Sequence, residues 1–128
     1  ASPPVLQIYP IETYIAEELH AYTMPLACTN TRVKGLPDIA LLAGIRSLQT
    51  ERLRAALEQT LTHRATHALP SATPDPPASW SVPYQQMARE NELPWPTLEG
   101  LTAAAAAFLD PMLARGARIW HPARWTWE

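Results

Sequence analysis

The chain has 128 residues, of which 47% are hydrophobic, so it can form about one domain with a packed core. Ten Lys and Arg residues against twelve Asp and Glu residues give a net charge of −2, which excludes an overall basic nucleic-acid binder. The single cysteine excludes a disulfide framework, and no apolar run reaches the ~20 residues that span a bilayer. We therefore expect a cytoplasmic protein with no membrane partner.

The N-terminal segment predicts a strand followed by a helix. Residues 5–9 are apolar and bounded by prolines, which is typical of a strand, and no other segment offers this strand a convincing partner. Since the chain also begins at Ala1 and not at a methionine, we expect a fragment or a processed product. Pro10 suits the first position of a helix, whose apolar residues recur at positions 11, 14, 15, 19 and 22.

The apolar stripe of this first helix predicts which of its side chains are buried. The stripe is centred near Ile11. The opposite, polar side carries Thr13, Glu17 and His20. Glu18 falls inside the stripe, where a carboxylate is costly unless it is paired, solvated or used in function.

Two further helices are expected before residue 65. The second runs from residues 36–37 to about Leu48, and it is apolar on most sides, so it should be the most buried element. Asp38 lies in its first turn, where a negative charge interacts favourably with the helix dipole. The third runs from an N-cap at Thr50 to about Arg64. Its buried face consists of Leu53, Ala56, Leu57, Thr60 and Leu61.

A proline-rich arm is expected to follow. Residues 66–83 carry prolines at positions 70, 74, 76, 77 and 83, which favours an extended segment with polyproline character. We expect this arm to wrap its own domain, with Trp80 as its anchor. The alternative is that the arm binds an aromatic groove of a partner protein.

The C-terminal part predicts further helices and a packed tail. A short helix is expected over residues 83–91, and a longer one is capped by Thr97 and runs to Phe108. Asp110 and Pro111 are expected to begin a separate last turn as a new cap and first helical residue. The final residues carry three tryptophans and should pack onto the body of the protein.

Together these elements predict a mainly α fold. We expect a small helical bundle, with one short N-terminal strand and the proline-rich wrapping arm, in a single domain over residues 1–128. Its parts are a strand with three helices over 5–64, the arm over 66–83, and the C-terminal helices with the tryptophan-rich tail over 84–128.

Several kinds of active site are excluded by spacing. His63 and His67 are four residues apart, but the glutamate of a metalloprotease motif is absent, so we expect two surface histidines and no metal site. Cys28 has no forced histidine neighbour and is expected to be inert. The four glycines form no phosphate-binding fingerprint.

One region does favour anion binding. Arg32 and Lys34 precede the helix that begins near Pro37, which brings two cations and a helix N-terminus together. Phosphate binding is physically reasonable at such a place. The alternative is a solvated loop whose cations pair with neighbouring carboxylates.

Three phrases of the sequence follow one another in a recognisable order. They are YPIETYIAEELHAYT at 9–23, NTRVKGLPDIALL at 30–42, and ALPSATPDPPASWSVPYQQMA followed by LTAAAAAFLDPML in the second half. Together they resemble the C-terminal half of the AbiEii/AbiGii-type nucleotidyltransferase toxin family of abortive-infection and type IV toxin–antitoxin systems. The resemblance covers nearly the whole chain.

The resemblance implies a function in phage defence. An N-terminal nucleotidyltransferase core would hold Mg²⁺ and NTP with a Gly-Ser turn and an Asp-x-Asp pair, and a helical part would complete the active site. The implied reaction transfers a nucleotide from NTP to an acceptor such as tRNA, and the implied partners are that core or an antitoxin. Neither N-terminal motif occurs in this sequence, so we expect this chain alone to bind no cofactor.

Two active-site elements of the family should lie within this chain. One is a lysine in the first helix, and Glu18 occupies its position. The other is an R-x-K-D-x-x-D phrase, which Arg32, Lys34 and Asp38 match while Gly35 replaces its first aspartate. The resemblance therefore assigns Glu18 and Asp38 to catalytic positions, and it assigns Arg32 and Lys34 to nucleotide or phosphate binding.

The two departures decide whether the chain is expected to be an enzyme. Nucleotidyl transfer needs positive charge or a metal ion around the polyphosphate, and Glu18 repels phosphate unless it binds a metal ion. We therefore expect the chain to be inactive alone. This expectation requires the Glu18 carboxylate to point toward Asp38 and the Arg32–Lys34 pair, and not into bulk solvent.

Two functions are left open by the sequence. The first is the helical part of a nucleotidyltransferase toxin-like protein, as a fragment, a remnant or one half of a split enzyme. The second is a non-catalytic helical module that binds a protein. An exposed apolar patch around Val5, Ile11 and Ile15 would then predict a homodimer.

Overall fold

The computed structural model describes residues 10–23, 34–64, 70–114 and 118–128, and this part of the chain is mainly helical, as predicted. The strand expected at residues 5–9 lies outside the described residues. The elements in chain order are α1 (Ile11–Tyr22), α2 (Gly35–Ala43), β1 (Leu48–Gln49), α3 (Thr50–Arg64), a 3₁₀ turn (Ala78–Trp80), α4 (Ser81–Glu90), α5 (Leu98–Leu113), β2 (Ile119–His121) and β3 (Thr126–Trp127).

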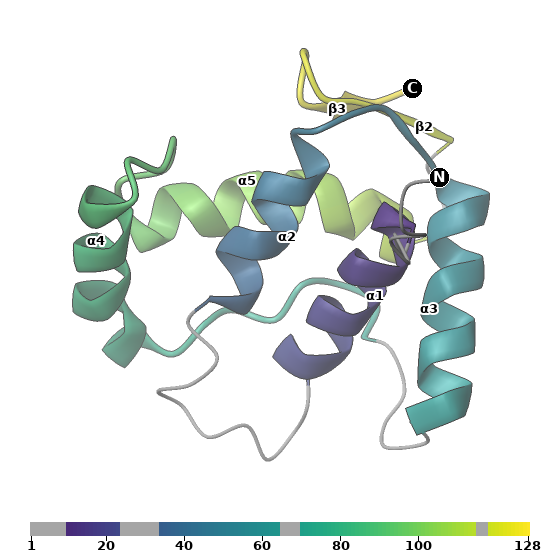
Figure 1. The fold of residues 1–128 in the computed structure, drawn as a ribbon, viewed down its shortest axis with the longest axis horizontal. Coiled ribbons are helices and arrows are strands. Elements are labelled where there is room, and N and C mark those ends of the chain that lie inside the picture. Colours follow the sequence, from purple (N-terminus) through teal and green to yellow (C-terminus); the bar gives the residue numbers. More distant parts are fainter. Residues whose placement is uncertain (1–9, 24–33, 65–69, 115–117) are drawn as a thin grey trace, which may run out of the picture.

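The first two helices lie in the middle of the molecule (Figure 1). α1 packs against both α2 and α3, and α2 packs onto α5, which runs across the molecule. α4 stands at one end of α5, on the opposite side from α3. The described part of the arm, residues 70–77, crosses between α3 and α4 (Figure 1).

The buried face of α1 differs from the prediction. Tyr14, expected in the apolar stripe, is 47% exposed, whereas His20, expected on the polar side, is buried. The reason is that α1 has two neighbouring helices, so its covered face is wider than one stripe and is turned away from Tyr14. Ile15 is fully buried in this interface, so it cannot contribute to the exposed patch expected for a homodimer, and Val5 lies outside the described residues.

The predicted end of α2 is also wrong. The helix stops at Ala43 and does not reach Leu48, because residues 48–49 leave it to form β1. β1 pairs antiparallel with β2, with Leu48 opposite Trp120. Six of the nine residues of α2 are buried, which agrees with the expectation of a strongly buried helix.

α5 is one continuous helix through Asp110 and Pro111, so the separate last turn expected there does not exist. Proline removes one helical hydrogen bond, and the carbonyl left free is that of the exposed residue Ala107, which water can reach. Asp110 accepts hydrogen bonds from the backbone N–H of Thr73 at 2.7 Å and from its hydroxyl at 2.6 Å. The carboxylate therefore ties the arm to α5.

The N-cap predicted for this helix at Thr97 is confirmed, since the Thr97 hydroxyl accepts a hydrogen bond from the N–H of Gly100.

The arm wraps the domain and is anchored as predicted. Pro77 has φ −59° and ψ 141°, which is polyproline geometry. The Tyr22 hydroxyl donates to the Pro74 carbonyl at 2.5 Å. Trp80 is 4% exposed, and its ring meets that of Tyr22 edge-on, with centroids 6.2 Å apart.

The tail packs as expected, but as a β-hairpin that the sequence did not predict. β2 and β3 pair antiparallel, with Trp120 opposite Trp127. Trp120 is fully buried, and its indole N–H donates to the Ala43 carbonyl at 2.8 Å. The Trp127 indole donates to the Phe108 carbonyl at 2.7 Å, so the hairpin covers α5.

The third helix runs close to its predicted bounds and keeps its buried face, in which Leu53, Leu57 and Thr60 are buried. Thr50, expected as the N-cap, is instead the first residue of the helix. The hydroxyl and the backbone N–H of Thr50 both donate to the Arg118 carbonyl, which joins the start of α3 to the tail. Among the described residues, every helix is too short or too polar to cross a lipid bilayer.

Candidate functional site

The candidate site lies where α1 meets the first turn of α2. The Oε2 atom of Glu18 is 3.7 Å from the position that a Cβ would take at Gly35, and Cβ of Tyr22 is 3.8 Å from the same point. Gly35 is buried and Glu18 is half-buried. The Glu18 carboxylate is therefore turned toward the start of α2 and not out into bulk solvent.

Asp38 lies one turn further along α2. At 100° per residue, it is rotated by ~60° around the helix axis from Gly35. Asp38 is half-buried, while Lys34, just before the helix, is exposed. Burial raises the pKa of the Asp38 carboxyl, and the Lys34 ammonium group partly offsets this effect. A carboxylate with a raised pKa accepts a proton more readily, as a general base must.

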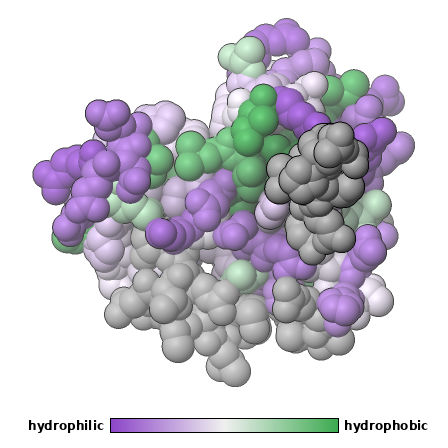
Figure 2. Space-filling view, in the orientation of Figure 1, coloured by the Kyte–Doolittle hydropathy of each residue, from purple (hydrophilic) through white to green (hydrophobic). Residues whose placement is uncertain are grey.

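Lys34 and Asp38 form part of one wall of a groove between α2 and α4, with a cavity of about 220 Å³. Figure 2 shows apolar surface gathered in the middle of this face of the molecule, over α2, with hydrophilic surface on the side of α4. The remaining lining residues are Pro37 and Leu41 from α2, and Met87, Asn91 and Leu93 from α4 and the turn after it.

The structure shows two separate pairings among the residues that the sequence singled out. Glu18 lies beside Gly35, while Lys34 and Asp38 line the groove between α2 and α4 together. Arg32 lies outside the described residues. The α4 wall of the groove was missed by sequence reasoning, because its residues lie about fifty positions further along the chain and carry no motif.

The donor set of this site meets only part of what Mg²⁺ requires. Mg²⁺ is usually held by one or two carboxylates together with waters and substrate phosphates. The site offers the carboxylates of Glu18 and Asp38, and no group of three or more His, Cys, Asp or Glu able to hold a metal ion occurs in the part of the chain that the structure describes. These residues fit a supporting role toward the ion but not a complete ligand set. His63 is exposed on α3, and His67 lies outside the described residues.

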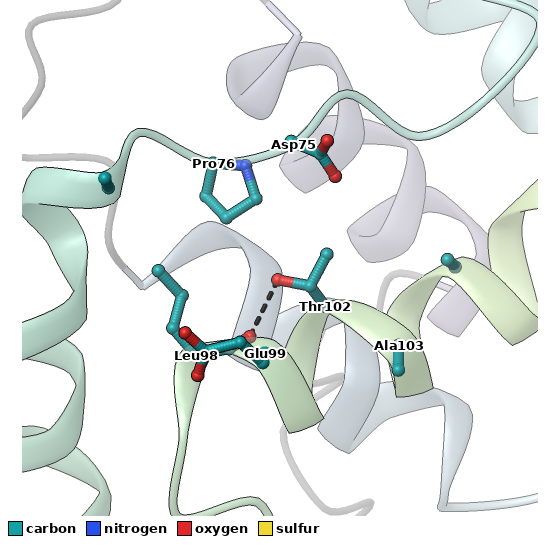
Figure 3. A pocket seen from close by; sticks show the side chains of 8 residues that line it. Asp75, Pro76, Leu98, Glu99, Thr102 and Ala103 are labelled. Carbon is teal, nitrogen blue, oxygen red and sulfur yellow. Dashed lines mark hydrogen bonds between the residues drawn. The ribbon is translucent and has the colours of Figure 1, made fainter.

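A larger groove, of about 480 Å³, lies between the arm and α5 (Figure 3). Asp75 and Pro76 of the arm face Leu98, Glu99 and other residues of α5 across it. Its charged groups are the carboxylates of Asp75 and Glu99, which repel phosphate. This groove is therefore unsuited to the polyphosphate of a nucleotide, unlike the groove beside Lys34.

The fold and the site define a mainly helical protein with a mixed-charge site at the start of a buried helix. The family model of the nucleotidyl transferase AbiEii toxin of the type IV toxin–antitoxin system matches residues 1–112. The chain belongs to this family, which confirms the resemblance inferred from the sequence. Neither a curated protein nor a solved structure matches the chain.

Proposed function

We propose that this chain forms the helical side of a nucleotidyltransferase toxin site, and that its own charge pattern leaves it unable to transfer a nucleotide alone. The observation that carries the proposal is the position of the Glu18 carboxylate beside Gly35. The resemblance places a lysine at the position of Glu18 and an aspartate at the position of Gly35. The contact supports the view that the two positions face each other and have changed together.

The charge change has a direct consequence for phosphate binding. Replacing a lysine by Glu18 and an aspartate by Gly35 lowers the charge of the site by one unit overall. A lysine stabilises the charge that develops on the phosphates during transfer, and a carboxylate opposes it. The loss of the aspartate removes the repulsion that two neighbouring carboxylates would otherwise have, so the scaffold tolerates the change.

The remaining residues keep roles that the reaction can use. Arg32 and Lys34 would bind phosphate oxygens at the N-terminal end of α2, where the helix dipole adds positive potential. Asp38 would accept the proton of the acceptor hydroxyl. In the transfer step, the acceptor oxygen bonds to the α-phosphorus of NTP, the bond from that phosphorus to the β-phosphate oxygen breaks, and pyrophosphate leaves. A resident Mg²⁺ would supply further positive charge to the phosphates.

A transfer assay with labelled NTPs and a tRNA pool tests this proposal. The chain alone is expected to label no tRNA, and robust labelling would refute the proposed inactivity. NTP binding, measured by calorimetry, should become tighter in the double variant Glu18→Lys, Gly35→Asp. The matched control is Glu58→Gln, which makes the same charge change of one unit at an exposed position on α3. Equal gains in the two variants would contradict a local effect at the site.

A second candidate function is protein binding, and the groove of Figure 3 favours it. Its small apolar side chains and two carboxylates suit a partner segment in which apolar residues alternate with Lys or Arg. In the described part of the chain, neither Asp75 nor Glu99 forms an ion pair. A fluorescent Leu/Lys amphipathic peptide should bind the chain and lose affinity in the double variant Asp75→Asn, Glu99→Gln. Equal binding of a Leu/Glu peptide would refute this alternative.

A further inference from the structure

The groove between α2 and α4 continues directly from the candidate phosphate site. Lys34 directly precedes the first turn of α2 and Asp38 lies on that turn, and both also line the groove, so the two sites share these residues. A ligand whose phosphates are held at Lys34 would therefore place its next group in the groove. The further residues of the groove decide which group that is.

Four of the seven residues that line the groove are apolar, and they come from both sides of it. Pro37 and Leu41 lie on the α2 side, and Met87 and Leu93 lie on the α4 side. Leu41 is 41% exposed, which is high for a large apolar residue next to a core. The cavity of about 220 Å³ is smaller than the ~300–1,000 Å³ of pockets that enclose a drug-sized ligand. It is therefore suited to a single planar ring system between apolar side chains.

Asn91 supplies the polar group of the groove. Its side-chain N–H donates to the Met87 carbonyl at 2.9 Å, which fixes the amide and leaves one N–H and the Oδ1 oxygen available. A donor beside an acceptor is the pattern that pairs with the edge of a nucleobase through two hydrogen bonds.

The turn after α4 holds these residues in place. Glu92 has φ 52°, in the left-handed region that non-glycine residues rarely adopt. The N–H of Leu93 donates to the Ala88 carbonyl at 2.9 Å, and the N–H of Glu92 donates to the Arg89 carbonyl at 3.4 Å, which together make a Schellman motif. This closure of the helix end positions both Asn91 and Leu93 along the groove.

We infer that the groove between α2 and α4 binds the nucleobase of the nucleotide whose phosphates lie at Lys34. This inference rests on the proposed function and adds a base-binding subsite to it. Met87 and Leu93 pack on one side of the ring, Pro37 and Leu41 pack on the other, and the Asn91 amide pairs with the edge of the base. Asn91 is a specificity residue in this arrangement, and it takes no part in the chemistry.

Binding of ATP and of inorganic tripolyphosphate to the full chain separates the two proposals. Titrations by calorimetry at low salt use the wild type and the Glu18→Lys variant, in which the phosphate site is more positive. ATP should bind at least about fivefold more tightly than tripolyphosphate, because stacking and pairing of the base add to phosphate binding. Asn91→Leu and Met87→Ala should each reduce this ratio and leave tripolyphosphate binding unchanged. Gln86→Ala, a polar residue of α4 that does not line the groove, is the matched control.

Each outcome of these titrations leads to one conclusion. If neither ligand binds either protein, the phosphate site fails and the base subsite fails with it. If both ligands bind equally, or if the Asn91 and Met87 variants lower binding of both ligands alike, the phosphate site stands and the base subsite is refuted. Far-ultraviolet circular dichroism of each variant shows that a change in binding does not come from unfolding.

Discussion

The contact between Glu18 and Gly35 predicts that a carboxylate at position 35 destabilises the fold. In Gly35→Asp the new side chain starts 3.7 Å from Oε2 of Glu18, so the two carboxylates lie about 4 Å apart or slightly more. Two like charges at 4 Å repel by ~4 kcal/mol at an effective dielectric constant of 20 and by ~1 kcal/mol in water. Glu18 is half-buried, and the helix dipole stabilises an acidic residue at this end of α2 by about 0.3–1 kcal/mol. The expected net loss is about 1–2 kcal/mol relative to the neutral variant Gly35→Asn.

The same reasoning predicts rescue by a lysine at position 18. In the double variant Glu18→Lys, Gly35→Asp, repulsion becomes attraction, so the double variant should be more stable than Gly35→Asp alone. The wild type, the two single variants and the double variant form a double-mutant cycle. Urea unfolding followed by tryptophan fluorescence measures the stability of each, and 0.5 M salt should reduce the coupling energy between positions 18 and 35. Gly35→Ala is the steric control, because its Cβ would meet only ordinary contacts. A coupling energy of zero within error would refute the proximity of the two side chains.

Three further predictions concern the core, the arm and the site. Trp120→Phe removes the N–H that satisfies the Ala43 carbonyl, so the free energy of unfolding should fall by about 1–3 kcal/mol in urea titrations; an unchanged midpoint would contradict that bond. Asp110→Ala removes both hydrogen bonds from Thr73 and should cost about 1.5–3 kcal/mol, with earlier cleavage of the arm in limited proteolysis, and the same cleavage rate as wild type would disprove the tie. The folded state binds the Asp38 proton more tightly than the unfolded state, so this group lowers stability as pH rises above its ordinary pKa of 3.8. Asp38→Asn should therefore have a more favourable effect on the free energy of unfolding at pH 7 than at pH 3. Equal effects at the two pH values would contradict the raised pKa.

The elements that the sequence predicted well are those whose signals are local. Thr97 accepts the N–H of Gly100 as an N-cap should, and α3 runs close to its predicted bounds and keeps its buried face. The first turn of α2 is also local, which is why a short phrase sufficed to place Lys34 and Asp38 together.

The elements that sequence reasoning missed depend on distant partners. His20 is buried because two helices cover α1, and periodicity within α1 does not reveal a second neighbour. α2 ends early because Leu48 pairs with Trp120, more than seventy residues away. The α4 wall of the groove, with Asn91, likewise meets α2 only through the tertiary fold.

The β2–β3 hairpin limits how far this chain can be shortened without exposing its core. The family match ends at residue 112, yet Trp120, beyond that limit, is fully buried and bonded to the end of α2. A chain of the first 112 residues alone would therefore lack the largest fully buried side chain of the described residues. A protein trimmed to the family boundary should accordingly be more exposed to proteases and aggregation than the chain that carries the hairpin.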